Sequence, residues 1–226
     1  MKYSNITEGV FLARPNRFTA LVDIGGSTEV CHVKNTGRCR ELLIPGVRVF
    51  LEKSGNPARK TAYDLTAVYK GNALINIDSQ APNRAFGEWV RNSGFFGEKV
   101  TVKPETGFAL SRFDFYIESE ERKIFAEVKG VTLEEDGVVL FPDAPTERGL
   151  KHVKELTEAV KQGYEAYIFF VIQMKNCSYF IPNRKTHPEF AEALVLAKEN
   201  GVNIQAVNCT VTPDSMEICD FVEVRL

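Results

Sequence analysis

The chain has 226 residues, 44% of them hydrophobic and 26% charged, and a formal net charge of −2. This composition excludes a disordered chain, and the length allows one large hydrophobic core or two modest ones. Residues 1–9 are polar, and the longest apolar run, residues 166–174, is far too short to cross a bilayer, so we expect a soluble, cytoplasmic protein. The five cysteines are widely spaced and form no Cys-x-x-Cys pair, which argues against a disulfide framework or a zinc site.

The two parts of the chain differ in charge. Residues 1–82 carry 11 Lys and Arg against 7 Asp and Glu, a net charge of +4, whereas residues 83–226 carry 17 against 23, a net charge of −6. A basic first part attracts phosphate groups, and an acidic second part is tolerable where some carboxylates hold a cation. The asymmetry is mild, so it is compatible with a nucleic-acid partner without requiring one.

The first 80 residues consist of short β-like segments separated by turns. Turns are expected at Asn35-Thr36-Gly37 and Lys70-Gly71-Asn72, and residues 39–43 are predicted to form a short helix. The predicted strands cover residues 9–23, with Arg14–Arg17 between two halves, and residues 28–33, 47–51, 62–68 and 73–77. Five or six strands with one helical insertion indicate a small closed β-barrel, of which the OB-fold is a common example.

A domain boundary is predicted at residue 82, after which the pattern becomes mixed α/β. The first helix is expected over residues 84–96, the second between the N-cap Thr146 and Gly163, and the third over residues 188–200. Residues 167–172 form a continuous apolar run of strand length, which indicates a strand buried on both faces. Further strands are expected at residues 99–103, 108–117, 123–129, 131–133, 138–141, 202–211 and 221–224. Residues 83–226 are therefore predicted to form a layered α/β domain with a mixed central sheet.

Two of these strands place charged residues on a sheet that is otherwise apolar. In residues 124–129 the strand period of two puts Glu127 and Lys129 on the same face. In the preceding strand Asp114 lies on the face opposite to the apolar residues Phe113, Phe115 and Ile117. If the two strands pair, two carboxylates and a lysine converge on one patch.

Such a patch has the chemistry for hydrolysing a phosphodiester. Two carboxylates held close together repel unless a proton or a cation lies between them. Mg²⁺ or Mn²⁺ bound by Asp114, Glu127 and substrate phosphate oxygens would lower the pKa of a bound water, and Lys129 could orient that water. From the spacing alone, a structural Glu127–Lys129 ion pair on a sheet edge is the better explanation. The sequence has no glycine-rich P-loop and no recognisable serine or cysteine nucleophile, and its three histidines lack metal-ligand spacing.

A resemblance to a known family favours the chemical interpretation. The segments 111–115 (SRFDF), 127–133 (EVKGVTL) and 141–149 (FPDAPTERG), followed by Lys151-His152, are similar to the sugar fermentation stimulation protein family, SfsA. Asn35-Thr36-Gly37 and Pro45-Gly46 fit the same family, so the resemblance covers nearly the whole chain. It implies an N-terminal OB-fold and a C-terminal domain of the PD-(D/E)XK nuclease superfamily. In that superfamily's pattern Asp114 is the first acid, Glu127 the second and Lys129 the lysine.

The resemblance leaves some positions open. Phe113 stands where the superfamily's name has proline, and Pro142-Asp143 spells the motif's first two letters only after the Glu-x-Lys. Asp143 is therefore a further candidate metal ligand, with a structural turn as the alternative. Glu105 is a candidate third acid on the same terms. Gln173, at the end of the buried strand, could face the site or be a simple buried amide.

Basic and aromatic residues suggest where nucleic acid would bind. The helix after Thr146 carries Arg148, Lys151 and His152 on the side away from its apolar stripe, which suits phosphate contact. In the barrel, basic residues mixed with an aromatic one suit backbone contact together with base stacking. These barrel residues are Arg14, Arg17, Phe18, His32, Lys34, Arg38 and Arg40. Scattered solvated charge explains both sets equally well.

These observations favour a DNA-binding, Mg²⁺- or Mn²⁺-dependent phosphodiesterase with Asp114, Glu127 and Lys129 as its catalytic cluster. The alternative is a non-catalytic DNA-binding regulator of sugar (maltose) metabolism genes, in keeping with the family's name. An activity directed at RNA stays open too, because barrel domains take either polymer.

Overall fold

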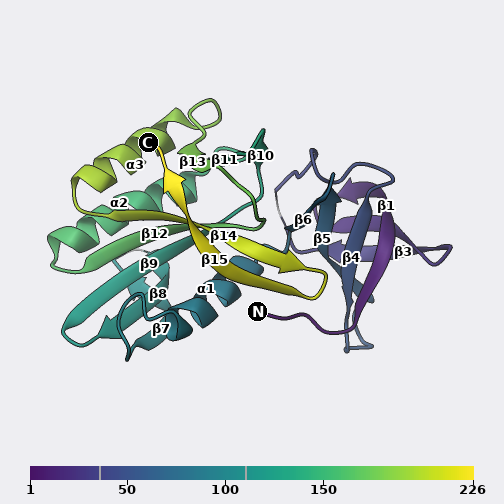
Figure 1. Cartoon of the computed structure of the whole chain (residues 1–226), viewed down its shortest axis with the longest axis horizontal. Helices are drawn as coiled ribbons and strands as arrows, with labels where there is room; N and C mark the ends of the chain where they lie inside the picture. Colours follow the sequence, from purple (N-terminus) through teal and green to yellow (C-terminus); the bar gives the residue numbers. More distant parts are fainter. Residues whose placement is uncertain (36, 110) are drawn as a thin grey trace.

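The computed structural model describes residues 1–35, 37–109 and 111–226. In the first part, β3 pairs with β5 and closes five strands into a barrel in the order β3-β2-β1-β4-β5, with β6 added at β5 (Figure 1). The strands are β1 (Ile6–Asn16), β2 (Thr19–Ile24), β3 (Ser27–Val33), β4 (Arg48–Lys53), β5 (Tyr63–Lys70) and β6 (Ala73–Asn76). The predicted OB-like barrel is confirmed.

Alternation of side chains along the strands fills the barrel. Phe11 of β1, Val22 of β2 and Leu65 of β5 are buried in one core cluster. The β5–β6 hairpin turns at Gly71, whose φ of +59° suits glycine. In the predicted turn at residues 35–37, the Asn35 side chain accepts a hydrogen bond from the Gly37 backbone N–H at 2.7 Å. Thr36 lies outside the described residues.

The predicted helix at residues 39–43 is wrong. Cys39 has a φ of +45°, a left-handed conformation that an α-helix cannot include, and its carbonyl closes only a single turn with the N–H groups of Leu42 and Leu43. The buried Cys39 and Leu42 side chains anchor this loop to the barrel core. Cys39 and Leu42 are three residues apart and both buried, as on one face of a helix, but here they lie in a loop.

The second part is a mixed nine-stranded sheet with the order β10-β11-β13-β15-β14-β12-β9-β8-β7. Helices α2 and α3 cover one face and α1 the other, as Figure 1 shows. The strands are β7 (Thr101–Phe108), β8 (Ser111–Ser119), β9 (Arg122–Val131), β10 (Glu134–Glu135), β11 (Val138–Phe141), β12 (Glu165–Ile172), β13 (Tyr179–Pro182), β14 (Asn203–Thr212) and β15 (Ser215–Val224). The helices are α1 (Ala81–Asn92), α2 (Glu147–Lys161) and α3 (Pro188–Glu199).

Strand β12 lies in the middle of this sheet and is buried on both faces, as its apolar run predicted. Phe170 packs into the core beneath α2 and α3, whereas Phe169 packs against Phe86 of α1 with ring centroids 4.7 Å apart. The N-cap is also as predicted, because the Thr146 hydroxyl accepts a hydrogen bond from Gly149 N–H at 3.0 Å. Strand β13 was not predicted from the sequence.

The two parts are joined by contacts far apart in the sequence. The Met1 amino group donates to the carbonyl of Met216 at 2.8 Å, and Tyr3 N–H donates to the carbonyl of Asp214 at 2.7 Å, so the start of the chain adds to the β14–β15 hairpin. Beside it, Gln173 after β12 donates from its side-chain amide to Asn76 at the end of β6. In the described part of the chain, no helix is long and apolar enough to cross a membrane.

Candidate active site

Asp114 and Glu127 meet where β8 and β9 begin to separate. The antiparallel pairing of these strands ends at Phe115 opposite Ala126, so Asp114 and Glu127 occupy the next two positions. There the Asp114 carboxylate, not a backbone carbonyl, accepts the hydrogen bond from Val128 N–H at 2.8 Å. Its other oxygen accepts from the Asn83 side chain of α1 at 2.9 Å. Asp114 is thus held by hydrogen bonds from β9 and from α1.

Strand β8 is irregular at Asp114, so one prediction about the faces of this strand is wrong. Phe113 and Phe115 were predicted to share a face, but Phe113 packs beneath α2, beside Phe125, while Phe115 packs against Phe86 of α1. The side-chain hydrogen bond of Asp114 replaces a regular step of the ladder, so the strand turns at this residue. The turn separates β8 from β9 at the carboxylates.

Glu127 is 2% exposed and its two oxygens have different surroundings. Oε1 accepts from Lys129 Nζ at 2.6 Å, and His152 Nδ1 lies within hydrogen-bond distance of the same oxygen. Oε2 is buried and has no hydrogen-bond partner among the described residues. A buried acceptor without a donor is costly, so this oxygen is suited to a ligand.

The two carboxyls have pKa values shifted in opposite directions. Burial and the nearby charge of Glu127 raise the pKa of Asp114 above its ordinary value. Burial also favours the protonated form of Glu127, but the His152 hydrogen bond and the charge of Lys129 outweigh it and lower its pKa. Glu127 therefore holds its charge, and Asp114 is held in a position where a second negative charge is unfavourable without a cation.

The site offers few side chains that could ligate a metal ion. No cluster of three His, Cys, Asp or Glu side chains in the described residues is arranged to hold a metal ion. Asp114 and Glu127 supply two carboxylates, and Mg²⁺ commonly takes two carboxylates and keeps several waters. The unpartnered Oε2 and the raised pKa of Asp114 both fit an oxygen-ligated cation between these groups.

His152 differs from its predicted position on a solvent-facing stripe. It is 3% exposed, lies on the buried side of α2 and contacts Glu127, with its ring 6.1 Å from that of Phe113. His152 therefore does not lie on the solvent-facing stripe from which a phosphate contact was predicted. Its adjacency to Glu127 was not predicted, because a helical pattern does not say which strand the helix crosses.

The Arg14 guanidinium is hydrogen-bonded to the protein's own backbone. Its guanidinium donates to the carbonyl oxygens of Asn35, Gly37, Arg17 and Arg38 at 2.7, 2.9, 2.7 and 2.6 Å. These bonds hold the loop after β3 against the turn after β1. The structure gives Arg14 a structural contact in place of the predicted phosphate contact.

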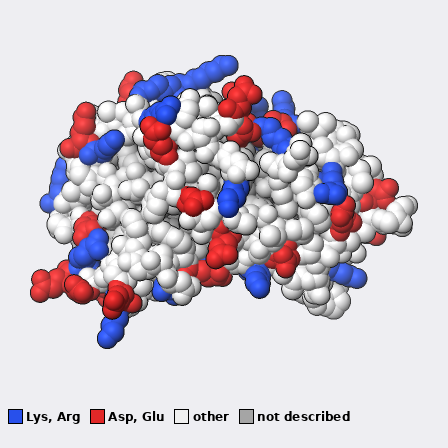
Figure 2. Space-filling model, in the orientation of Figure 1, with Lys and Arg blue, Asp and Glu red and all other residues white. Residues whose placement is uncertain are grey.

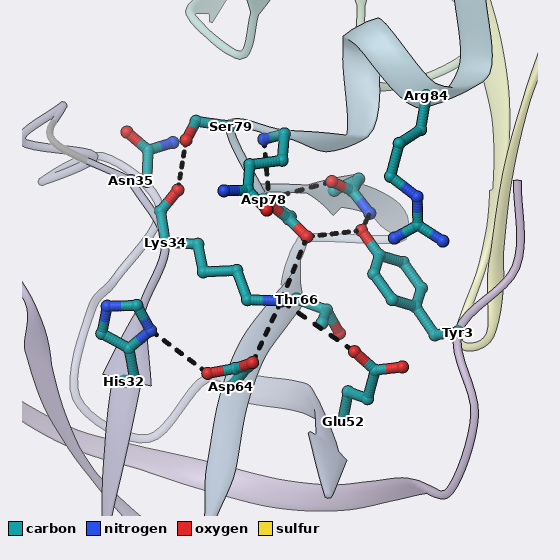
Figure 3. Close-up of polar contacts among 12 residues, drawn as sticks. Tyr3, His32, Lys34, Asn35, Glu52, Asp64, Thr66, Asp78, Ser79 and Arg84 are labelled. Carbon is teal, nitrogen blue, oxygen red and sulfur yellow. Dashed lines mark hydrogen bonds and ion pairs between the residues drawn. The ribbon is translucent and has the colours of Figure 1, made fainter. Parts of the chain in front are cut away.

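Lys34 is likewise surrounded by carboxylates. Its ammonium lies 3.0 Å from Asp64, 3.7 Å from Asp78 and 4.0 Å from Glu52 (Figure 3). Asp64 also accepts from His32 at 3.1 Å and from Arg59. With three carboxylates around it, Lys34 carries little net positive potential toward solvent, which differs from its predicted role in binding phosphate.

The other predicted nucleic-acid contacts lie at the surface. Arg17 stacks over the ring of Phe18, which is 48% exposed, with 5.4 Å between guanidinium carbon and ring centroid. Arg38 and Arg148 are exposed, and Lys151 lies 3.7 Å from Glu155 on the outer side of α2. On the face drawn in Figure 2, Lys and Arg alternate with Asp and Glu over both domains.

The side chains of the two further acids form no metal-ligating cluster with Asp114 and Glu127 in the described part of the chain. Glu105 lies on the edge strand β7 with its side chain 76% exposed, 3.3 Å from Arg112. Asp143 is exposed at the junction between the domains, where its Oδ2 would be 2.8 Å from a Cβ built on Gly37. Neither was distinguishable from the pair by sequence spacing alone.

An OB barrel followed by a mixed sheet with three helices defines a two-domain class of protein. The chain matches the family model described as "SfsA N-terminal OB domain" over residues 12–77 and the one described as "Sugar fermentation stimulation protein RE domain" over residues 80–215. The chain belongs to the SfsA family.

Relatives share its full length. A sugar fermentation stimulation protein homolog of Desulfitobacterium hafniense (strain DSM 10664 / DCB-2) is 62% identical over 100% of this chain and 99% of the relative. A homolog of Ruminiclostridium cellulolyticum is 57% identical over 100% of both chains. Among solved structures, SfsA of Pyrococcus furiosus in complex with Ca²⁺ superposes with a TM-score of 0.91 at 31% identity, covering 100% of this chain and 98% of that one.

Proposed function

We propose that the chain is a divalent-metal-dependent phosphodiesterase that acts on nucleic acid, DNA in the first place, and that residues 83–226 are a PD-(D/E)XK nuclease domain. The observation that carries this proposal is the buried Oε2 of Glu127, which has no hydrogen-bond partner among the described residues, beside an Asp114 whose pKa is raised by burial and by the charge of Glu127.

Asp114 and Glu127 would hold the cation, Mg²⁺ or Mn²⁺. When bound, it would lower the pKa of a coordinated water and neutralise charge on the phosphate. The likeness to a Pyrococcus furiosus protein described in complex with Ca²⁺ supports an oxygen-ligated ion on this chain as well. Asn83 and Val128 orient Asp114, while Lys129 and His152 hold Oε1 of Glu127 and thereby direct Oε2 away from themselves.

Lys129 has a second role in this account. Its side chain is 15% exposed, so the ammonium is shielded from bulk water yet reachable by a substrate. There it stabilises negative charge that develops on the attacking oxygen or on the phosphate, an interaction that is stronger in the transition state than in the ground state.

The test is a cleavage assay on single-stranded, double-stranded and branched DNA and on RNA, with Mg²⁺ or Mn²⁺ and with EDTA. Lys129→Ala should keep the fold and the metal response but lose cleavage by about a hundredfold or more. Lys154→Ala, an exposed lysine on α2, is the matched control and should cleave like the wild type. Metal-dependent cleavage that survives Lys129→Ala unchanged would contradict the assignment, and no cleavage on any substrate would favour a DNA-binding regulator.

A further inference from the structure

A cavity of about 170 Å³ lies between the domains, at the carboxyl ends of the parallel strands β9 and β12. Gly130 and Val131 of β9 line it directly after Lys129, so it adjoins the candidate active site. In sheets with parallel strands, ligands bind beyond the carboxyl ends of the strands. Its volume is below the about 300 Å³ of drug-sized sites, so it suits a fragment the size of one base.

Two polar side chains that line this cavity, Gln173 and Asp143, offer hydrogen-bond acceptors. The Gln173 amide nitrogen donates hydrogen bonds to the Asn76 side chain and to the Asp78 carbonyl. The amide oxygen Oε1 therefore points toward Gly130, where it would lie 2.7 Å from a Cβ added to that residue. Gln173 is 2% exposed, yet Oε1 accepts no hydrogen bond from the described residues. The exposed carboxylate of Asp143 lines the same cavity. These two acceptors suit a ligand that donates hydrogen bonds.

The lining also includes the apolar side chains Leu133, Leu140 and Phe141 and the polar residues Asn35, Ser79 and Thr132. Glycine at 130 keeps the floor open, because a Cβ there would lie 2.7 Å from both Gln173 Oε1 and a ring carbon of Pro82. The cavity therefore combines apolar side chains, one of them an aromatic ring, with the two acceptors on Gln173 and Asp143.

A second cavity, of about 250 Å³, adjoins the first through Gly37, which lines both. It is lined by Arg14, Arg17, Arg38 and Arg40. Arg14 is committed to carbonyl oxygens, but the other three are exposed, and no ion pair with a carboxylate joins them in the described part of the chain. Three such guanidinium groups favour an anion, phosphate above all.

We propose that the two cavities together bind one nucleotide whose base carries an exocyclic amino group. The base lies between the domains with its amino group on Asp143 and Gln173 Oε1, and the phosphate lies at the arginines. Thymine presents a carbonyl oxygen where cytosine presents an amino group. Against two acceptors that oxygen is repelled, so the site discriminates between the two bases. The proposal deepens the proposed function by naming the substrate unit that lies beside the catalytic cluster.

The test measures binding of fluorescent oligo(dC), oligo(dT) and an abasic oligomer of about 12 nucleotides to the full-length protein by anisotropy, at neutral pH in EDTA. The wild type should bind oligo(dC) about tenfold more tightly than oligo(dT). Asp143→Asn should reduce that preference to about twofold or less, because the amide can donate to thymine. Asp220→Asn, the same change at an exposed site on β15, should preserve it. Leu140→Trp, which fills the cavity, should abolish it.

Arg38→Ala should weaken binding of all three oligomers without changing the preference, whereas Lys198→Ala on α3 should change neither. Competition with dCMP separates the two sources of the ligand. If dCMP displaces oligo(dC) from the wild type but not from Asp143→Asn, a free nucleotide suffices for binding. If only the oligomers show the preference, the bound nucleotide belongs to a chain. Equal wild-type affinities for oligo(dC) and oligo(dT), or a preference that persists in folded Asp143→Asn, would overturn the proposal. Because EDTA prevents cleavage, this result is independent of the nuclease assignment.

Discussion

His152 and Lys129 share one oxygen of Glu127, and this arrangement fixes the direction of the other oxygen. Partners behind a metal ligand commonly contribute tenfold to a hundredfold in metal affinity. His152→Ala should therefore weaken Mn²⁺ binding about tenfold, measured by isothermal titration calorimetry. His32→Ala, which removes a histidine bonded to Asp64 in the barrel, should leave that affinity unchanged. Equal affinities in the two variants would show that His152 does not position the carboxylate.

Arg14 shows how a residue type predicted for binding can be required for structure. One guanidinium satisfies four carbonyl oxygens of two neighbouring loops, a fork that lysine cannot reproduce. Arg14→Lys should lower the free energy of unfolding by about 2 kcal/mol. Urea titration followed by circular dichroism measures this, with the exposed Arg17→Lys as the control. Coincident unfolding curves would contradict the structural role.

At the same scale, the sequence could predict Asp114 beside Glu127 because the β8–β9 hairpin brings these two positions together, although the strand period fails at Asp114. It could not predict Asn83 or His152, because each comes from a helix whose orientation depends on packing over the sheet. The partners of basic residues within the protein could not be predicted for a related reason. Composition does not show that Arg14 bonds to carbonyl oxygens of neighbouring loops, or that Lys34 lies among carboxylates.

Among the elements, those that bury a continuous apolar run were the easiest to predict. Strand β12 and the capped helix α2 follow directly from hydrophobic pattern and N-cap chemistry. The short β13, with four residues, is too brief for a periodic signal, and it forms only because β11 and β15 provide neighbours. The loop at residues 39–43 shows the opposite case, because Cys39 and Leu42 have the spacing of a helix face but are buried in a loop.

The barrel strands β3 and β5 are coupled by the ion network around Asp64. Burial opposes ionisation of Asp64, but the hydrogen bonds from Arg59 and Lys34 prevail and hold its pKa at about 2. Because the folded pKa lies below the unfolded one, this stabilisation is complete above about pH 4 and is lost as the pH falls toward about 2. It should amount to about 2 kcal/mol.

Asp64→Asn should remove this part of the acid sensitivity. Urea unfolding of wild type and variant at pH values from about 7 to 2 measures the difference. The two proteins should differ most at neutral pH and converge in acid. A constant difference across that range would mean that the charge of Asp64 contributes nothing to the stability of the barrel.

For the whole molecule, the junction between the domains explains why the candidate site lies where it does. The start of the chain joins the β14–β15 hairpin, and Gln173 joins the end of β12 to β6. The carboxyl end of β9, with Lys129 and the adjoining cavity, therefore lies against the barrel. The charge difference between residues 1–82 and 83–226 is consistent with a polyanion held by the barrel and cleaved at carboxylates in the second domain.

The central claim is that Asp114 and Glu127 share one divalent cation, and thermal unfolding with and without Mn²⁺ tests it most directly. An ion that binds only the folded state raises the melting temperature by mass action. Wild-type protein should therefore melt at a higher temperature as Mn²⁺ is added, and Asp114→Asn should lose most of that rise. Asp220→Asn, an exposed aspartate on β15, should respond like the wild type. An equal Mn²⁺ response in wild type and Asp114→Asn would contradict the account.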